Sequence, residues 1–328
     1  MNRRRALQAL GMAAALFSAP ARAQGGTRVH RIAFLGTMSA DAEAMRRTMA
    51  SFREGLADEG FAEGRNYVVD FVAEPDVARA PDRIRQLLVR TPAVLVVMTT
   101  PVAQAAVKVA RETPVLFTAV SDPIESGLVA SLGRPGGNVT GVSSMLPELS
   151  GKLLELVGEL VPNASRIAVL WNPDNPAKAL ELRALRDAAS RSKIALHELP
   201  ARSAEEIEAA LAALGRTGAR ALVVLAESLS FAHRKRINEL ARASRVPVIA
   251  NLTQHTEAGG LASYTADYAM LNRRLGALAA KILAGATPAT LPVELPTRFV
   301  LTVNLQSAKA LALKIPQSVL LRADRVIE

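Results

Sequence analysis

The chain has 328 residues, half of them hydrophobic, and this length and composition suffice for two packed domains rather than one. Its net charge of +10 does not indicate nucleic-acid binding, because basic and acidic residues are interspersed and no basic stripe carries interleaved aromatic side chains. Cysteine is absent, which excludes disulfides and a cysteine-linked lipid anchor.

The first 23 residues have the features of a cleavable export signal. Arg3-Arg4-Arg5 form a basic start, 6–20 are mostly apolar, and Ala21-Arg22-Ala23 is an A-x-A cleavage site. The apolar run is too short to cross a bilayer comfortably. Cleavage would remove four arginines and lower the net charge from +10 to +6. We therefore predict a periplasmic, monomeric protein that is exported by the Sec or the twin-arginine route.

Strand-like and helix-like segments alternate along the rest of the chain. Short apolar runs predict strands, and apolar residues at helical spacing predict helices. The first half has predicted strands at 31–36, 67–73, 93–98, 114–120 and 139–143, with helices at 40–59, 81–90, 102–111 and 123–132. The pattern then repeats, with strands at 166–171, 194–199, 219–225 and 246–250, and with helices at 148–160, near 176–193, from 203, and at 231–244. A strand at 259–264, a helix at 268–283, the stretch 291–305 and a short tail at 320–328 complete the chain. This alternation indicates parallel sheets with helices on both faces.

The stretch from Ala119 to Ser144 combines a strand end, an expected helix start and a glycine turn. Asp122 is placed to cap the helix, with Pro123 at its first position and Glu125 at its third, as in a capping box. Ligands of open α/β sheets bind at the carboxyl ends of the strands, close to helix N-termini. We therefore expect this stretch to form one wall of a binding cleft.

Six segments carry a resemblance to a known family, and they occur in the family's order: IAFLG (32–36), FREGLADEGFAEGRN (52–66), SDPIESGLVASLGRPGGNVTGVSS (121–144), LLELVGELVPNASRIAVLWNPDNP (153–176), GGLASY (259–264) and LPTRFVLTVNLQSAKALALKIPQSVLLRADRVIE (295–328). The chain resembles the substrate-binding proteins of ABC transporters, in the group that includes tryptophan- and tyrosine-binding members. The resemblance implies the periplasmic-binding-protein-like I fold, an α/β fold of two Rossmann-like lobes with parallel sheets, joined by a three-segment hinge. It implies that one lobe comprises 28–145 plus about 266–291, and the other 146–265 plus about 292–328.

Polar residues at strand ends are the candidates for ligand contact. Thr100, Asp122 and Asn175 each precede a proline at an expected helix start, where free N–H groups and the helix dipole favour a carboxylate. Asp122 and Glu227 could bind an ammonium group, and Trp171 could stack on an aromatic ligand. The predicted ligand-binding set is Gly36, Thr37, Met38, Thr99, Thr100, Ser121, Asp122, Trp171, Asn172, Glu227, Asn251 and Tyr264.

Each of these residues also has a purely structural interpretation. Asp122 can serve only as a helix cap, Glu227 can be solvated, and Trp171 can pack in the core or at a hinge. Asn251 and Tyr264 end strands and could equally lie in the hinge. The sequence leaves both interpretations open.

No motif in the sequence indicates catalysis or a metal. The four histidines lack metal-ligand spacing, G-x-S-x-G does not occur, and the S-x-x-K match at 190–193 lies at the end of an expected amphipathic helix. We expect no cofactor and no enzyme activity. The leading hypothesis is a receptor that captures a small solute, an amino acid or related carboxylate, and delivers it to the membrane permease of an ABC importer. The alternative is a sensory module that binds the same kind of ligand and reports to a membrane receptor.

Overall fold

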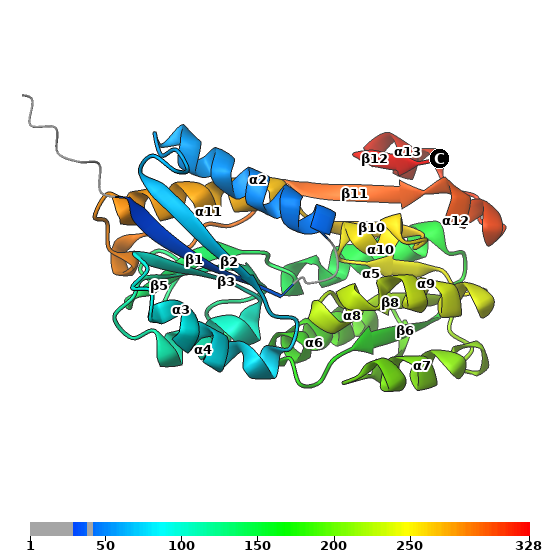
Figure 1. Cartoon of the computed structure of the whole chain (residues 1–328). Helices are drawn as coiled ribbons and strands as arrows, with labels where there is room; N and C mark the ends of the chain where they lie inside the picture. Colours follow the sequence, from blue (N-terminus) through cyan, green and yellow to red (C-terminus); the bar gives the residue numbers. More distant parts are fainter. Residues whose placement is uncertain (1–28, 38–41) are drawn as a thin grey trace, which may run out of the picture.

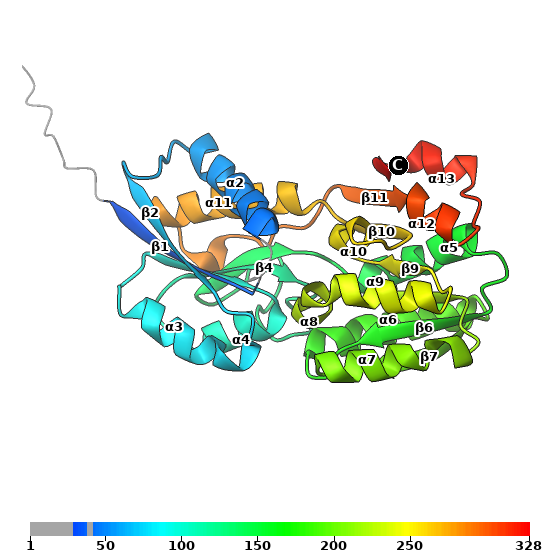
Figure 2. The same cartoon turned by 45° about the vertical axis from the view of Figure 1, so that its right-hand side comes forward.

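The computed structural model describes residues 29–37 and 42–328, which form two α/β lobes, each built on its own sheet (Figure 1). The first strand begins at the outer end of one lobe, and Glu328 lies on the other lobe (Figure 2). None of the helices in this part of the chain is both long and apolar enough to cross a membrane.

Lobe 1 is a five-stranded parallel sheet in the order β2-β1-β3-β4-β5. Its strands are β1 (His30–Gly36), β2 (Tyr67–Ala73), β3 (Val94–Met98), β4 (Val115–Val120) and β5 (Val139–Ser143). One face is covered by α2 (Ala42–Asp58) and α11 (Tyr268–Leu283), the other by α3 (Ala80–Leu88) and α4 (Thr100–Val109). Because helices cover both faces, the central strands are continuous apolar runs; every residue of β3 is buried.

Lobe 2 is a seven-stranded sheet in the order β12-β11-β10-β9-β8-β6-β7. Its strands are β6 (Arg166–Trp171), β7 (Ala195–Pro200), β8 (Ala221–Val224), β9 (Val248–Ala250), β10 (Ala262–Ala266), β11 (Phe299–Asn304) and β12 (Arg325–Ile327). Its helices are α5 (Ser150–Leu160), α6 (Pro176–Arg191), α7 (Ala204–Ala212), α8 (Ser228–Ala232), α9 (Arg234–Ala243), α10 (Thr253–Glu257), α12 (Leu305–Ala310) and α13 (Gln317–Arg322). The core on one face includes α5 and α6, and the core on the other includes α7 and α9.

One strand pair of lobe 2 departs from the predicted parallel arrangement. β10 and β11 are antiparallel, whereas the other paired strands of this sheet run parallel. After β10 the chain enters lobe 1 to form α11, and it returns as β11 from the side of lobe 1. The returning strand therefore runs opposite to the one that left.

Three chain segments join the lobes, as the resemblance implied. They follow β5, lie between β10 and α11, and precede β11. The third crossing is hydrogen-bonded to the end of β5, where the first crossing begins: the N–H of Glu294 donates to the carbonyl of Gly141 (3.0 Å), and that of Ser143 donates to the carbonyl of Glu294 (2.9 Å). The third crossing is thus tied to the edge of the lobe 1 sheet and is not a loose linker.

The predicted helix at 123–132 is wrong, because this segment contains only turns. Asp122 does accept the N–H groups of Ile124 and Glu125, both at 3.0 Å, so the first turn forms. Gly127 then adopts φ +70°, and the N–H of Leu128 donates back to the carbonyl of Pro123. This pattern terminates a helix, so the segment stops after one turn.

Two further boundaries differ from the prediction. The predicted helix at 231–244 is two helices, α8 and α9, that meet at His233. Helix α4 begins at Thr100 rather than after it, so Thr99 is the residue at the N-cap position, and Thr99 makes no side-chain cap. Asn175 does cap α6 as expected, since its side chain accepts the N–H of Ala177 at 3.2 Å.

Candidate functional site

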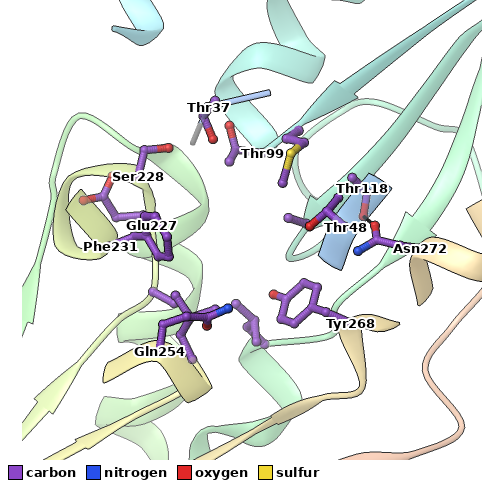
Figure 3. A pocket seen from close by; sticks show the side chains of 15 residues that line it. Thr37, Thr48, Thr99, Thr118, Glu227, Ser228, Phe231, Gln254, Tyr268 and Asn272 are labelled. Atoms are coloured by element: carbon purple, nitrogen blue, oxygen red, sulfur yellow. Dashed lines mark hydrogen bonds between the residues drawn. The ribbon is translucent and has the colours of Figure 1, made fainter. Parts of the chain in front are cut away.

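A cavity of about 110 Å³ lies between the two lobes, where the carboxyl ends of their strands face each other (Figure 3). Lobe 1 contributes residues from three strand ends and two helices, lobe 2 contributes residues after β8 and β9, and one residue lies in a crossing segment. The lining consists of Thr37, Thr48, Met98, Thr99, Thr118, Ala119, Leu146, Ala226, Glu227, Ser228, Phe231, Leu252, Gln254, Tyr268 and Asn272. This is the location at which open α/β sheets bind ligands.

Two strained residues form part of the lobe 1 wall. Thr99 has φ +72° and Ala119 has φ +54°, and residues other than glycine, Asn and Asp rarely adopt a positive φ. Ala119 coincides with a register shift between β4 and β5, and Thr99 donates its N–H to the carbonyl of Thr118 (3.0 Å). The hydroxyl oxygen of Thr99 is buried without a partner among the described residues. Strain and an unpaired polar atom concentrate at ligand sites.

Among the described residues, Glu227 is the one carboxylate in the lining, and no basic side chain accompanies it. It caps α8 through two reciprocal hydrogen bonds. The Glu227 carboxylate accepts the backbone N–H of Ser230 (2.9 Å), and the Ser230 hydroxyl accepts the backbone N–H of Glu227 (3.1 Å). One carboxylate oxygen makes this cap, and the other has no hydrogen-bond partner among the described residues. A capping box fixes the backbone of Glu227 and therefore the direction of its side chain.

Tyr268, which begins α11, supplies a phenol to the same cavity. Desolvation raises the pKa of Tyr268 to about 12, and the hydroxyls of Ser144 and Thr265 oppose this shift only in part. The phenol therefore stays protonated at neutral pH and contributes a hydrogen-bonding group without charge.

Of the residues predicted from the sequence, Thr37, Thr99 and Glu227 line this cavity. Met38 lies outside the described residues. The others do not line it: Gly36, Thr100, Ser121, Asp122, Trp171, Asn172, Asn251 and Tyr264.

Two of the residues outside the lining belong to a buried network behind it. Glu181 of α6 is completely buried, accepts the hydroxyl of Ser121 (2.6 Å) and the amide of Asn251 (3.2 Å), and forms an ion pair with Lys178. Asn251 also accepts the N–H of Ala226 at 2.7 Å, next to Glu227. Ser121 and Asn251 therefore position the strand ends around the cavity, through a carboxylate that the sequence analysis did not single out.

Four other predicted residues make their contacts outside the interlobe cavity. Asp122 lies in a separate cavity beside Glu148, whose pKa is raised by desolvation and by the charges of Asp122 and Glu181. Tyr264 stacks on Phe299, with ring centroids 5.9 Å apart. Trp171 packs against the core of lobe 2, and Asn172 accepts the N–H of Asp174.

The polar lining residues that the sequence analysis missed are Thr48, Thr118, Ser228, Gln254, Tyr268 and Asn272. The signal for one of them was present, because Asn272 interrupts the buried apolar stripe of α11 one turn after Tyr268. In residues 29–37 and 42–328, no group of three or more His, Asp or Glu side chains is placed to hold a metal ion.

Comparison with known proteins shows which family this sequence matches. Residues 32–327 match the family described as ABC transporter substrate binding protein. The chain is 29% identical over 270 residues to the tyrosine-binding protein of Clostridioides difficile (strain R20291), which covers 82% of this chain and 77% of that protein.

Two solved structures show which arrangement of the lobes this structure resembles. The ABC domain in complex with L-Trp from Streptococcus pneumonia has a TM-score of 0.85 at 27% identity, covering 91% of this chain and all (100%) of that chain. The ligand-free, open structure of a substrate binding protein with adhesive properties from Clostridium difficile has a TM-score of 0.68 at 28% identity, covering 91% and 99%. At nearly equal identity the chain superposes better on the tryptophan complex, so its lobes are placed more as in that complex. With the match extending over nearly all described residues, the chain belongs to the ABC transporter substrate-binding protein family.

Proposed function

We propose that this protein is the exported receptor of an ABC importer and that it captures an aromatic amino acid between its lobes, without chemical change. The observation that carries this proposal is the interlobe cavity, in which Glu227 is the one carboxylate among the described lining residues and the others are neutral polar or apolar. The tyrosine-binding relative and the tryptophan complex support the same ligand class.

The two sides of the cavity suit the two ends of such a ligand. Figure 3 shows the Ser228 hydroxyl of lobe 2 facing Thr37 and Thr99 of lobe 1, with Glu227 beside Ser228. Glu227 would bind the ammonium group through a charge-assisted hydrogen bond, and the hydroxyls would donate to the carboxylate. The aromatic ring would then lie against the apolar part of the lining, which is formed by Met98, Leu146, Phe231 and Leu252.

Ligand capture would proceed by closure of the lobes about the three crossings, and the closed form would then be recognised by a membrane permease. Hinge closure around a ligand is the usual motion of two-lobed binding proteins. Export is supported by the basic start, apolar run and A-R-A site of the first 23 residues. Amino-terminal sequencing of the exported protein should begin at Gln24; retention of the full chain in the cytoplasm would contradict export.

Isothermal titration of the purified protein with L-tryptophan, L-tyrosine and L-phenylalanine tests the ligand class. Glu227→Gln should weaken binding by about 10- to 100-fold, because a hydrogen bond to a charged group contributes about 1.5–3 kcal/mol. Asp122→Asn is the matched control, since it makes the same acid-to-amide change at a capping residue outside the cavity. Its affinity should stay within about twofold of the parent.

Absence of binding to all three amino acids would refute the proposed ligand class. If binding occurred but Asp122→Asn weakened it as much as Glu227→Gln, the ammonium site would not be Glu227.

A further inference from the structure

A buried hydrogen bond joins the two lobes outside the cavity lining. The hydroxyl of Ser121, which follows β4 of lobe 1, donates to Oε1 of Glu181 on α6 of lobe 2 at 2.6 Å. Glu181 is completely buried and Ser121 is only 2% exposed, so water has little access to this bond in the observed arrangement of the lobes. Hydrogen bonds to a charged group are stronger than those between neutral groups, and burial strengthens them further.

Ion pairs that also bridge the lobes lie at the surface of the protein. Arg47 of α2 is 3.5 Å from Glu257 of α10, and Arg183 of α6 is 3.5 Å from Glu125 of lobe 1. Exposed pairs of this kind contribute little to stability, because water and salt screen them. The bond from Ser121 is therefore the stronger candidate for holding the lobes together.

Glu181 is fixed in place by its own lobe. Asn251, which follows β9, donates its side-chain N–H to Oε2 of Glu181 at 3.2 Å, and Lys178 of the same helix forms an ion pair with the carboxylate. Lys178 is buried as well. A buried ion pair needs further hydrogen bonds to offset the loss of hydration. The Ser121 hydroxyl provides one of these bonds, and it does so only when the lobes are together.

The same bond is linked to the cavity lining from both lobes. In lobe 2, Asn251 accepts the backbone N–H of Ala226 at 2.7 Å, and Ala226 lines the cavity. In lobe 1, Ser121 lies two residues after Ala119, which lines the cavity with φ +54°. The hydrogen bond between Ser121 and Glu181 thus connects the strand ends that form the two walls of the cavity, although neither side chain lines it.

We propose that Ser121 and Glu181 form a latch that stabilises the closed arrangement of the lobes and raises the affinity for every ligand by one common factor. This inference rests on the proposed closure of the lobes but not on the identity of the ligand. When only the closed form binds, the apparent dissociation constant is the intrinsic constant divided by the closed fraction. Loss of the latch lowers that fraction and weakens all ligands equally. Both residues are positioning residues, since they act on the lobes and not on the ligand.

Ser121→Ala tests the latch, because it removes the hydroxyl and leaves the buried pair of Lys178 and Glu181 intact. Isothermal titration should show that L-tryptophan, L-tyrosine and L-phenylalanine all bind about tenfold more weakly, as expected for the loss of a hydrogen bond to a charged group. Small-angle scattering of the ligand-free proteins should give a larger radius of gyration for Ser121→Ala than for the parent, since the lobes separate more often.

Ser150→Ala is the matched control. Ser150 is buried, and its hydroxyl donates to the backbone carbonyl of the same Glu181 at 3.4 Å, but both residues belong to lobe 2. This change should leave the three affinities within about twofold of the parent and the radius of gyration unchanged. A purely structural role of Ser121 would change the midpoint of urea unfolding without changing the affinities.

Where the parent binds ligand, the affinities decide. Unchanged affinities of Ser121→Ala, unequal factors for the three amino acids, or an equal loss in Ser150→Ala would overturn the latch and leave the proposed function standing. If the parent bound none of the three, the proposed ligand class would fail by itself. Scattering from the ligand-free proteins would then decide: a larger radius of gyration in Ser121→Ala alone would support the latch, and equal radii in parent and variant would overturn it.

Discussion

Glu227 and Asp122 are both carboxylates that follow a buried strand and cap the next turn, yet they lie in different cavities. Glu227 lies between the lobes, whereas Asp122 lies beside Glu148 and the first crossing. Both carboxylates cap the turn after a buried strand, so this shared local role does not show which of them lies in the interlobe cavity. For a carboxylate of this kind, a cap and a ligand contact are compatible roles.

His255 is a residue whose protonation should influence stability. It is completely buried in α10, and neither ring nitrogen has a hydrogen-bond partner among the described residues. Desolvation lowers its pKa from 6.5 to about 3, with a smaller contribution from the charge of Arg234. The folded protein therefore keeps His255 neutral at a pH where the unfolded chain protonates it.

The sign of the pH dependence follows directly. Above pH 6.5 the ring is neutral in both states, and as the pH falls toward about 3 the unfolded chain gains a proton that the folded protein does not. The free energy of unfolding should then fall by up to about 1.4 kcal/mol per pH unit from this group alone. His255→Phe removes the titration, so urea unfolding between pH 7 and pH 4 should show a shallower decline for the variant. Equal slopes for parent and variant would contradict the assignment.

At the scale of elements, α2 and α11 pack at unusually close range through two glycines. A Cβ atom on Gly276 would lie 2.1 Å from the carbonyl oxygen of Phe52, and one on Gly55 would lie 1.7 Å from that of Arg273. Neither helix can accept even one added carbon without moving. Since α2 carries Thr48 and α11 carries Asn272, this contact also sets the spacing of the lobe 1 wall of the cavity.

Gly276→Ala should therefore lower the free energy of unfolding by about 1–3 kcal/mol, the usual cost of overpacking. Gly158→Ala is the control, because Gly158 is an exposed position inside α5 with open space around its would-be Cβ. That change should stabilise the protein by about 0.5–1 kcal/mol, since alanine favours the helix. Denaturant unfolding of both variants checks the contrast, and similar effects of the two changes would show that the helices can separate freely.

The elements themselves were largely predictable because each has a strong local signal. Apolar runs identified the strands, and the helix at 268–283 was predicted with its observed bounds. The segment after Asp122 was not, because a good N-terminal cap indicates where a helix starts but not how far it continues. There a left-handed Gly127 ended the helix after a single turn.

The cavity was less predictable than the fold, for a reason that belongs to the whole molecule. Its lining comes from both lobes and from segments more than 200 residues apart, such as Thr37 and Asn272. Local signals place polar residues at strand ends but do not say which ends face each other across the cleft. Thr37, Thr99 and Glu227 were found by that rule, whereas Asn272 and Tyr268 lie on a helix that returns to lobe 1 only after the second crossing.

Contacts outside the cavity lining also join the two lobes in this structure. The buried carboxylate of Glu181 in lobe 2 accepts the hydroxyl of Ser121 in lobe 1, and Arg47 of α2 lies 3.5 Å from Glu257 of α10. The Arg47–Glu257 pair is exposed, and such pairs contribute little to stability. These contacts join the two lobes in an arrangement that resembles the tryptophan complex more than the ligand-free, open structure.

The first described residue and the C-terminal residue lie on different lobes, which has a practical consequence. Val29 is half exposed in lobe 1 and Glu328 is exposed in lobe 2, both remote from the cavity lining. Because the sequence contains no cysteine, thiols introduced at these two positions would be the only ones available for labelling. A donor and an acceptor dye attached there would convert relative movement of the lobes into a change in energy transfer, and so make the protein a fluorescent reporter of its own ligand.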